Sequence, residues 1–201
     1  MEKEAENVQW GYNLTDKSKR KNYLITIGIN IGLILGMTCL SYLPMLALYR
    51  GLEEKTVYYG YSLAGCLTAI FSLLGGIIID SYEKRNLYLG YIIICFTCVG
   101  ALLLPGRNSI ILCLFILGLK AVFDNTEQAY FFDYFYGENT TRLWSFSASC
   151  QMIVEIIAPL FVGKLFDLNI TVMLIVSLGF IVFSFIGGLW LKKARGDKGG
   201  I

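Results

Sequence analysis

The 201-residue chain contains no histidine, and only 16% of its residues are charged. The absence of histidine removes the commonest proton relay and metal ligand of proteins. A soluble domain usually carries about 25% charged residues, so this composition excludes an ordinary soluble domain. The formal net charge is only +2, and such a small excess predicts no nucleic-acid partner.

Several signals of enzymes and secreted proteins are also missing. The sequence has no Gly-rich phosphate loop, no cluster of metal ligands and no nucleophile triad, so we expect no enzyme, no bound metal and no cofactor. The polar start of the chain leads into an apolar run that is too long for the core of a signal peptide. All six cysteines lie in apolar stretches, where cysteine is a common small core residue, so no disulfide framework is implied.

Apolar residues are abundant: they make up 56% of the chain, and its mean hydropathy is +0.60. A helix needs about 20 apolar residues to cross a bilayer. Six stretches are predicted to do so: 23–48, 57–79, 87–104, 109–132, 143–162 and 170–191. The sequence therefore predicts an all-α membrane protein, with a polar tail over 1–22, a six-helix transmembrane domain over 23–191 and a basic tail over 192–201.

The positions of Lys and Arg predict how this domain is oriented, because cytoplasmic loops are enriched in both residues. One side of the membrane would carry Lys3, Lys17, Lys19, Arg20, Lys21, Lys84, Arg85, Arg142, Lys192, Lys193, Arg195 and Lys198. The other side would carry only Arg50, Lys55, Arg107 and Lys164. We therefore expect a multi-pass protein of the plasma membrane with both termini in the cytoplasm.

The loop after the second predicted span carries a recognisable pattern. Gly76 and Asp80 are followed by Lys84 and Arg85. This resembles the signature loop of the major facilitator superfamily, Gly-x-x-x-Asp-(Arg/Lys)-x-Gly-x-(Arg/Lys)-(Arg/Lys), although Ser81 and Glu83 depart from it. The resemblance implies that the loop acts as a conformational latch which grips a partner half. From the residues alone, Gly76 would permit close approach of a neighbouring helix.

The fifth predicted span ends in a second partial pattern. Pro159 and Gly163 match the Gly-Pro-x-x-Gly-Gly motif in the fifth helix of many antiporters of the same superfamily, whereas Ala158 and Val162 replace glycines. A proline within a membrane helix is tolerated where neighbouring helices satisfy the freed carbonyl. Both patterns lie where a six-helix half of this superfamily has them, so the resemblance covers nearly the whole chain.

The resemblance implies three-plus-three inverted repeats and secondary active transport of a small molecule, with export as the expected direction. Such transporters need two six-helix halves around a central site. The chain is therefore expected to act in the bilayer as a homodimer or with a second half. Two alternatives stay open: a non-transporting accessory or immunity subunit, and a truncated half of a longer twelve-helix transporter.

Polar residues within the predicted spans are the candidate pathway. Asn30 is a polar residue of the first span, where Gly28, Gly32 and Gly36 form a groove suited to helix packing. Asn30 is therefore expected to face the cavity of the transport pathway. The three glycines are expected to face a neighbouring helix.

The fourth and fifth spans carry ionisable residues, which face a cavity or one another when they lie inside a membrane. Lys120, Asp124 and Glu127 are spaced to share one helical face, on which Lys120 and Asp124 can pair. Gln151 and Glu155 share a face of the next span. We predict a proton-coupling role for Glu127 or Glu155, or a buried Lys120–Glu155 pair. The alternative is that Lys120, Asp124 and Glu127 form only a structural charge network at the cytoplasmic end.

Overall fold

The computed structural model describes residues 17–137 and 139–193, and every regular element in these ranges is helical. The first segment consists of α1 (Lys17–Met37), a 3-10 turn η1 (Thr38–Tyr42) and α2 (Leu43–Tyr49). Then come α3 (Glu54–Ser81), α4 (Lys84–Ala101), α5 (Asn108–Lys120) and α6 (Thr126–Tyr134). The last two are α7 (Thr140–Leu168) and α8 (Ile170–Leu189). The N-terminal and C-terminal basic residues Lys3, Arg195 and Lys198 lie outside the described ranges.

Four segments are long and apolar enough to cross a membrane: Lys17–Tyr49, Glu54–Ser81, Thr140–Leu168 and Ile170–Leu189. They correspond to the first, second, fifth and sixth predicted spans. The third, α4, has 18 residues and begins with Lys84 and Arg85, which lower its hydropathy. Many large apolar side chains on the outside of the bundle are exposed, as the lipid-facing residues of a membrane protein would be.

The prediction of one continuous helix over 109–132 is wrong, because a run of turns over 121–125 separates α5 from α6. In this run the amides of Val122, Phe123 and Thr126 bond carbonyls three residues back rather than four. Asp124 and Asn125 belong to the residue types that compete with helical hydrogen bonds through their own side chains. The segment thus turns where its sequence becomes polar, and a new helix begins at Thr126.

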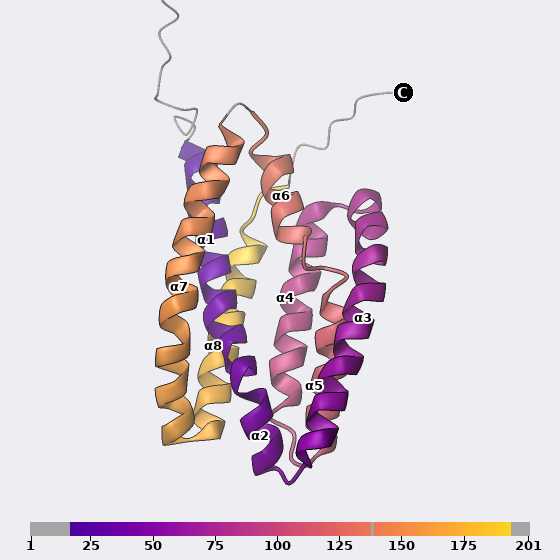
Figure 1. The fold of residues 1–201 in the computed structure, drawn as a ribbon. Coiled ribbons are helices and arrows are strands. Elements are labelled where there is room, and N and C mark those ends of the chain that lie inside the picture. The colour runs from indigo at the N-terminus through magenta and orange to yellow at the C-terminus, as the bar shows by residue number, and fades with distance from the viewer. Residues whose placement is uncertain (1–16, 138, 194–201) are drawn as a thin grey trace, which may run out of the picture.

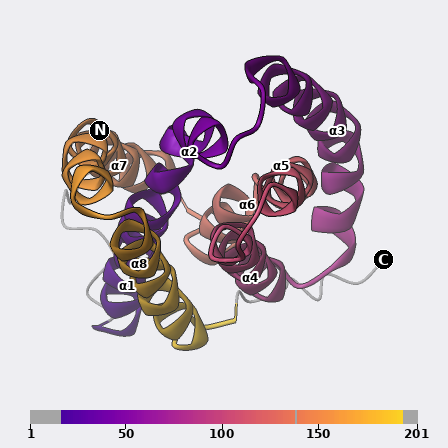
Figure 2. The ribbon, with the colours of Figure 1, turned by 90° about the horizontal axis from the view of Figure 1, so that it is seen from below.

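The helices lie roughly parallel to one another in a bundle (Figure 1). The α1 helix packs most closely against α8 and also against α7; α5 packs against α3 and α4, and α4 against α8. Seen along the bundle, α7 and α3 lie at the two flanks, with α1 and α8 beside α7 and with α4 and α5 between α8 and α3 (Figure 2). The core runs along α4, where Tyr88, Ile92, Cys95, Cys98 and Val99 are fully buried.

Two of the three glycines on α1 explain its close contact with α8. A β-carbon at Gly36 would lie 2.5 Å from Ile181 Cγ1 and 2.9 Å from the Ser177 carbonyl oxygen, and one at Gly32 would clash with Ser184 Oγ. Gly28 has no neighbour within 4 Å of such an atom. Gly32 and Gly36 thus lie where α1 approaches α8 most closely, whereas Gly28 faces open space.

Candidate functional site

Four helices contribute side chains to one polar cluster in the middle of the bundle. Glu127 Oε1, on α6, accepts hydrogen bonds from Asn30 Nδ2 on α1 (2.5 Å) and from Gln151 Nε2 on α7 (2.9 Å). The Tyr88 hydroxyl group, on α4, donates a hydrogen bond to Asn30 Oδ1. We call Asn30, Tyr88, Glu127 and Gln151 the central network. Asn30, Glu127 and Gln151 are three of the residues that the sequence predicts for the pathway.

The break between α5 and α6 determines where Glu127 lies. It is in the first turn of α6, so its carboxylate is at the end of a helix where backbone N–H groups point outward and favour negative charge. Asn30 is only 2% exposed, and its amide is used on both sides, as donor to Glu127 and acceptor from Tyr88. This satisfies a buried amide, which would otherwise be costly in an apolar interior.

A second set of hydrogen bonds closes the end of the bundle at which α1 begins and α8 ends. Asn22 Nδ2 donates to Tyr130 Oη (2.9 Å), Tyr130 donates to the Lys192 carbonyl (2.9 Å), and the Lys192 amide donates to Asn22 Oδ1 (3.0 Å). Tyr130 also stacks on Tyr88, with ring centroids 5.9 Å apart. The closing set is therefore joined to the central network through two aromatic rings.

Sequence reasoning missed Asn22, Tyr88 and Tyr130. Tyrosine is common at membrane interfaces and in packed cores, so the two tyrosines do not stand out in the sequence, and Asn22 falls at the end of the predicted polar tail. The one available signal was the spacing of Tyr88 with Tyr91 and of Tyr130 with Tyr134, because residues three or four apart share a helical face. In the structure both pairs stack, with centroids 6.5 and 5.8 Å apart.

The pairing of Lys120 agrees only in part with expectation. Lys120 forms the predicted ion pair with Asp124, and its Nζ lies 5.1 Å from the centroid of the Tyr91 ring. The predicted Lys120–Glu155 pair is not formed: Lys120 reaches the nearer Asp124 instead. Glu155 is exposed on α7 and makes no ion pair with any described residue.

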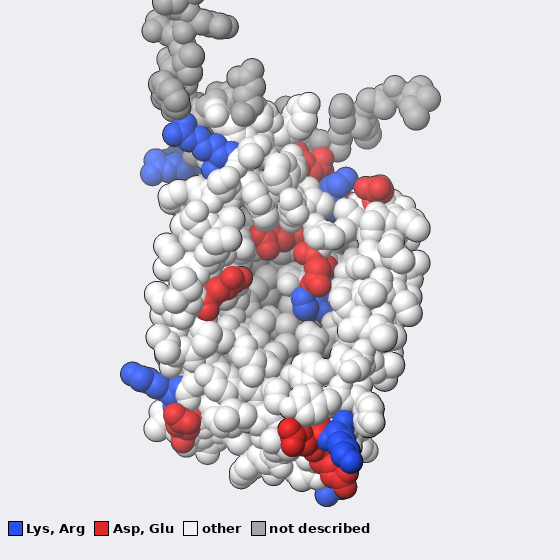
Figure 3. Space-filling model, viewed as in Figure 1, with Lys and Arg blue, Asp and Glu red and all other residues white. Residues whose placement is uncertain are grey.

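The ionisable residues are associated with a hollow. Figure 3 shows acidic and basic side chains around a depression in the middle of the face between α7 and the α5–α6 segment. The charged residues that these elements carry away from the ends of the bundle are Lys120, Asp124, Glu127 and Glu155. We call this depression the central hollow. Asp124 and Glu155 are exposed and Lys120, Glu127 and Gln151 are half-buried, whereas Asn30 and Tyr88 are buried beneath them. Accessible carboxylates beside an amide suit hydrogen bonding to a small polar or cationic molecule.

The predicted latch residues occupy two environments. Gly76 and Asp80 line a shallow pocket of about 310 Å³ against the start of α6, formed with Asn125, Gln128 and Phe132 among others. Asp80 is exposed and makes no hydrogen bond or ion pair with the described residues. The close approach expected at Gly76 occurs at Gly75 instead, where a β-carbon would lie 2.5 Å from the Val122 carbonyl oxygen.

The basic end of this loop is used within the chain. Arg85 donates a hydrogen bond of 3.0 Å to the carbonyl of Leu189, the last residue of α8. A cation near the last carbonyls of a helix is favourable. Lys84, the first residue of α4, is half-buried, and Glu83 pairs with Lys193 at 3.2 Å. The loop thus holds the end of α8 as well as the turn into α4.

Pro159 and Gly163 both contact the side chain of Tyr42. Tyr42, on η1, donates a hydrogen bond of 2.9 Å to the Pro159 carbonyl. A β-carbon at Gly163 would lie 2.5 Å from the Tyr42 hydroxyl oxygen, so only glycine leaves room for it. Both residues therefore contact the η1 turn, and through Tyr42 they hold it against α7.

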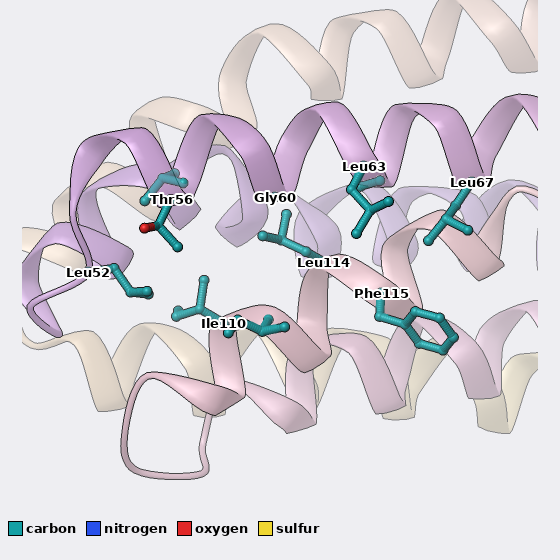
Figure 4. A pocket seen from close by; sticks show the side chains of 11 residues that line it. Leu52, Thr56, Gly60, Leu63, Leu67, Ile110, Leu114 and Phe115 are labelled. Carbon is teal, nitrogen blue, oxygen red and sulfur yellow. The ribbon is translucent and has the colours of Figure 1, made fainter.

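An apolar pocket of about 110 Å³ lies between α3 and α5. Figure 4 shows the side chains that line it, including Leu52, Leu63, Ile110, Leu114 and Phe115. Apart from Thr56 its side chains are apolar, so it offers no chemistry for a polar substrate. The central hollow remains the candidate site.

No family model matches the chain, and neither a curated protein nor a solved structure matches it. Over residues 17–137 and 139–193, no group of three or more His, Cys, Asp or Glu could hold a metal ion. The function is therefore inferred from the side chains of the central network and from the arrangement of the helices around them.

Proposed function

We propose that this chain is a six-helix half of a secondary transporter of the major facilitator type, with the central hollow as its share of the transport pathway. It would act as a homodimer or with a second half, and would move a small molecule across the plasma membrane. The observation that carries the proposal is that Asn30 and Gln151, from two different spans, both donate hydrogen bonds to the carboxylate of Glu127, on a third span beside a hollow. Intramembrane ionisable residues of this kind mark substrate or proton pathways.

The pattern of helix contacts supports a three-plus-three repeat. The first span packs against the fifth and sixth, and the fourth packs against the second and third, while the third packs against the sixth. Exchanging the first span with the fourth, the second with the fifth and the third with the sixth converts each of these contacts, which are the most extensive between spans, into another member of the same set. Inverted repeats in transporters have this property, and their binding sites lie near discontinuous helices such as α5–α6. In the described part of the chain, the smaller contact between the fifth and sixth spans has no comparable counterpart between the second and third.

Glu155 supports the need for a second half. It lies close to the midpoint of the 29-residue helix α7 and is exposed in the single chain. A carboxylate facing lipid at the centre of a membrane helix costs roughly 3 kcal/mol even on the mildest scale. Covering the central hollow with a second half, and filling it with water, would remove this cost.

The test combines assembly with transport. We expect the 22.6-kDa protein to be dimeric in lipid nanodiscs. In proteoliposomes containing a trapped pH indicator, it should couple proton movement to at least one solute from a panel of small cations, anions and neutral molecules. Glu127→Gln should abolish the coupling, because the amide cannot exchange a proton.

The matched control is Glu54→Gln, which makes the same chemical change on an exposed side chain at the start of α3. It should leave coupled flux unchanged. A stable monomer with no flux would contradict the homodimer and leave a second half as the required partner. Coupled flux that survives Glu127→Gln would remove the central network from the mechanism.

A further inference from the structure

A groove of about 730 Å³ lies between α1 and α8, apart from the central hollow. It is lined on α1 by residues from Lys17 to Ile29 and on α8 by residues from Phe183 to Trp190. Leu24 and Gly28 follow Asn22 and Thr26 by two residues, which is about half a turn of helix. The groove therefore lies on the face of α1 opposite the buried polar residues, on the outside of the bundle.

Most of the residues that line the groove are apolar, and the space beside Gly28 is empty. Leu24, Phe183, Ile186 and Trp190 line it and are each at least half exposed. Gly28 also lines it, and no atom lies within 4 Å of where its β-carbon would be. The missing side chain at Gly28 thus leaves a space between two helices whose outer surface is apolar and long enough to follow a lipid chain.

One end of the groove is basic. Lys17, Arg20 and Lys21 line it, all three are exposed, and no Asp or Glu contributes to the lining. Lys21 Nζ lies 5.7 Å from the centroid of the Trp190 ring. Figure 3 shows basic side chains gathered at this end of the bundle, over the start of α1. Trp beside Lys and Arg is the composition of a membrane–water interface.

We propose that this groove binds one anionic phospholipid, with its phosphate at Lys17, Arg20 and Lys21 and an acyl chain along Leu24, Gly28 and Phe183. Charge complementarity identifies the occupant: three cations without a carboxylate attract an anion, and the apolar wall continuing from them suits the chain attached to it. Basic pockets between membrane helices bind acidic headgroups in this way. The site is independent of the proposed transport function, because it shares no residue with the central network.

The test is a lipid titration of the purified protein followed by native mass spectrometry. Dioleoyl phosphatidylglycerol should bind at least tenfold more tightly than dioleoyl phosphatidylcholine, which has the same chains and no net charge. The triple variant Lys17→Gln, Arg20→Gln, Lys21→Gln should weaken phosphatidylglycerol binding by about a hundredfold, since each cation near a membrane surface contributes about fivefold. Gly28→Leu should weaken binding of the same lipid by filling the groove.

The matched control is Lys55→Gln, Arg107→Gln, Lys164→Gln, which removes the same charge from exposed positions at the other end of the bundle. It should leave phosphatidylglycerol binding unchanged. The proposal is overturned if this control weakens binding as much as the first triple variant, or if Gly28→Leu, shown to be folded by its thermal melt, binds normally. Complete displacement of the lipid by millimolar glycerol 3-phosphate would also overturn it, because the site would then recognise only a free phosphate.

Discussion

Replacing Gly36 and Gly28 one at a time with alanine tests whether α1 packs on α8 as described. Both glycines lie inside the same helix, so both changes remove the same backbone flexibility. In a helix interior this gains about 1 kcal/mol of stability. The two positions differ only in their surroundings, because Gly36 faces Ile181 and the Ser177 carbonyl, while Gly28 faces open space.

The expected difference follows from the contacts. A methyl group at Gly36 would lie 2.9 Å from a backbone oxygen, which cannot rotate away as a side chain can. Overpacking of this kind costs typically 1–3 kcal/mol. Gly28→Ala should therefore raise the free energy of unfolding by about 1 kcal/mol, whereas Gly36→Ala should leave it unchanged or lower it by up to about 2 kcal/mol.

Equilibrium unfolding in mixed detergent micelles, followed by circular dichroism, measures both free energies in the same solvent. The informative quantity is the difference between the two variants, since any effect of detergent on helix propensity is common to both. Equal stabilisation of the two variants would refute the close contact of α1 with α8 at Gly36.

Two further substitutions test the polar contacts by the same unfolding measurement. Gln151→Leu removes one donor from the Glu127 carboxylate and should destabilise the protein by about 1.5–3 kcal/mol, as for hydrogen bonds to charged groups; Ser149→Ala, which loses only a local bond on the exposed side of α7, should stay within about 0.5 kcal/mol of the parent. Tyr42→Phe removes the bond to the Pro159 carbonyl and should cost about 1 kcal/mol, whereas the exposed Tyr49→Phe should cost nothing measurable. An equal loss in either pair would contradict the corresponding hydrogen bond.

Polar residues inside apolar stretches allowed three of the four members of the central network to be predicted. Asn30, Glu127 and Gln151 stand out in the sequence because such residues are costly within a membrane unless they meet partners. Tyr88 does not stand out, because tyrosine is also common at interfaces and in packed cores. Its role depends on which hydroxyl group reaches Asn30, and that is determined by how α4 packs against α1.

The remaining differences arise from helix rotation and from the break in the fourth segment. Sequence spacing predicts that Lys120 and Glu155 lie on inward faces of their helices, but it does not predict the distance between those helices. In the structure Lys120 pairs with Asp124 on its own segment. Gly75 and Gly76 are adjacent, so a rotation of 100° decides which of them meets a neighbour. In the turns over 121–125, backbone hydrogen bonds to the carbonyl three residues back replace the helical bonds to the carbonyl four residues back. The conformation of these turns also depends on how α3 packs against Val122.

The contact between Gly75 and the Val122 carbonyl has a mechanical consequence. Asp80 lies five residues beyond Gly75 on α3, and Glu127 lies five residues beyond Val122. Because a β-carbon at Gly75 would lie 2.5 Å from a backbone oxygen, α3 cannot move closer to Val122 without displacing the turns over 121–125. A displacement of the end of α3 toward α6 would therefore also displace the turn that precedes Glu127, which connects the position of the Asp80 loop to that of the carboxylate in the central network.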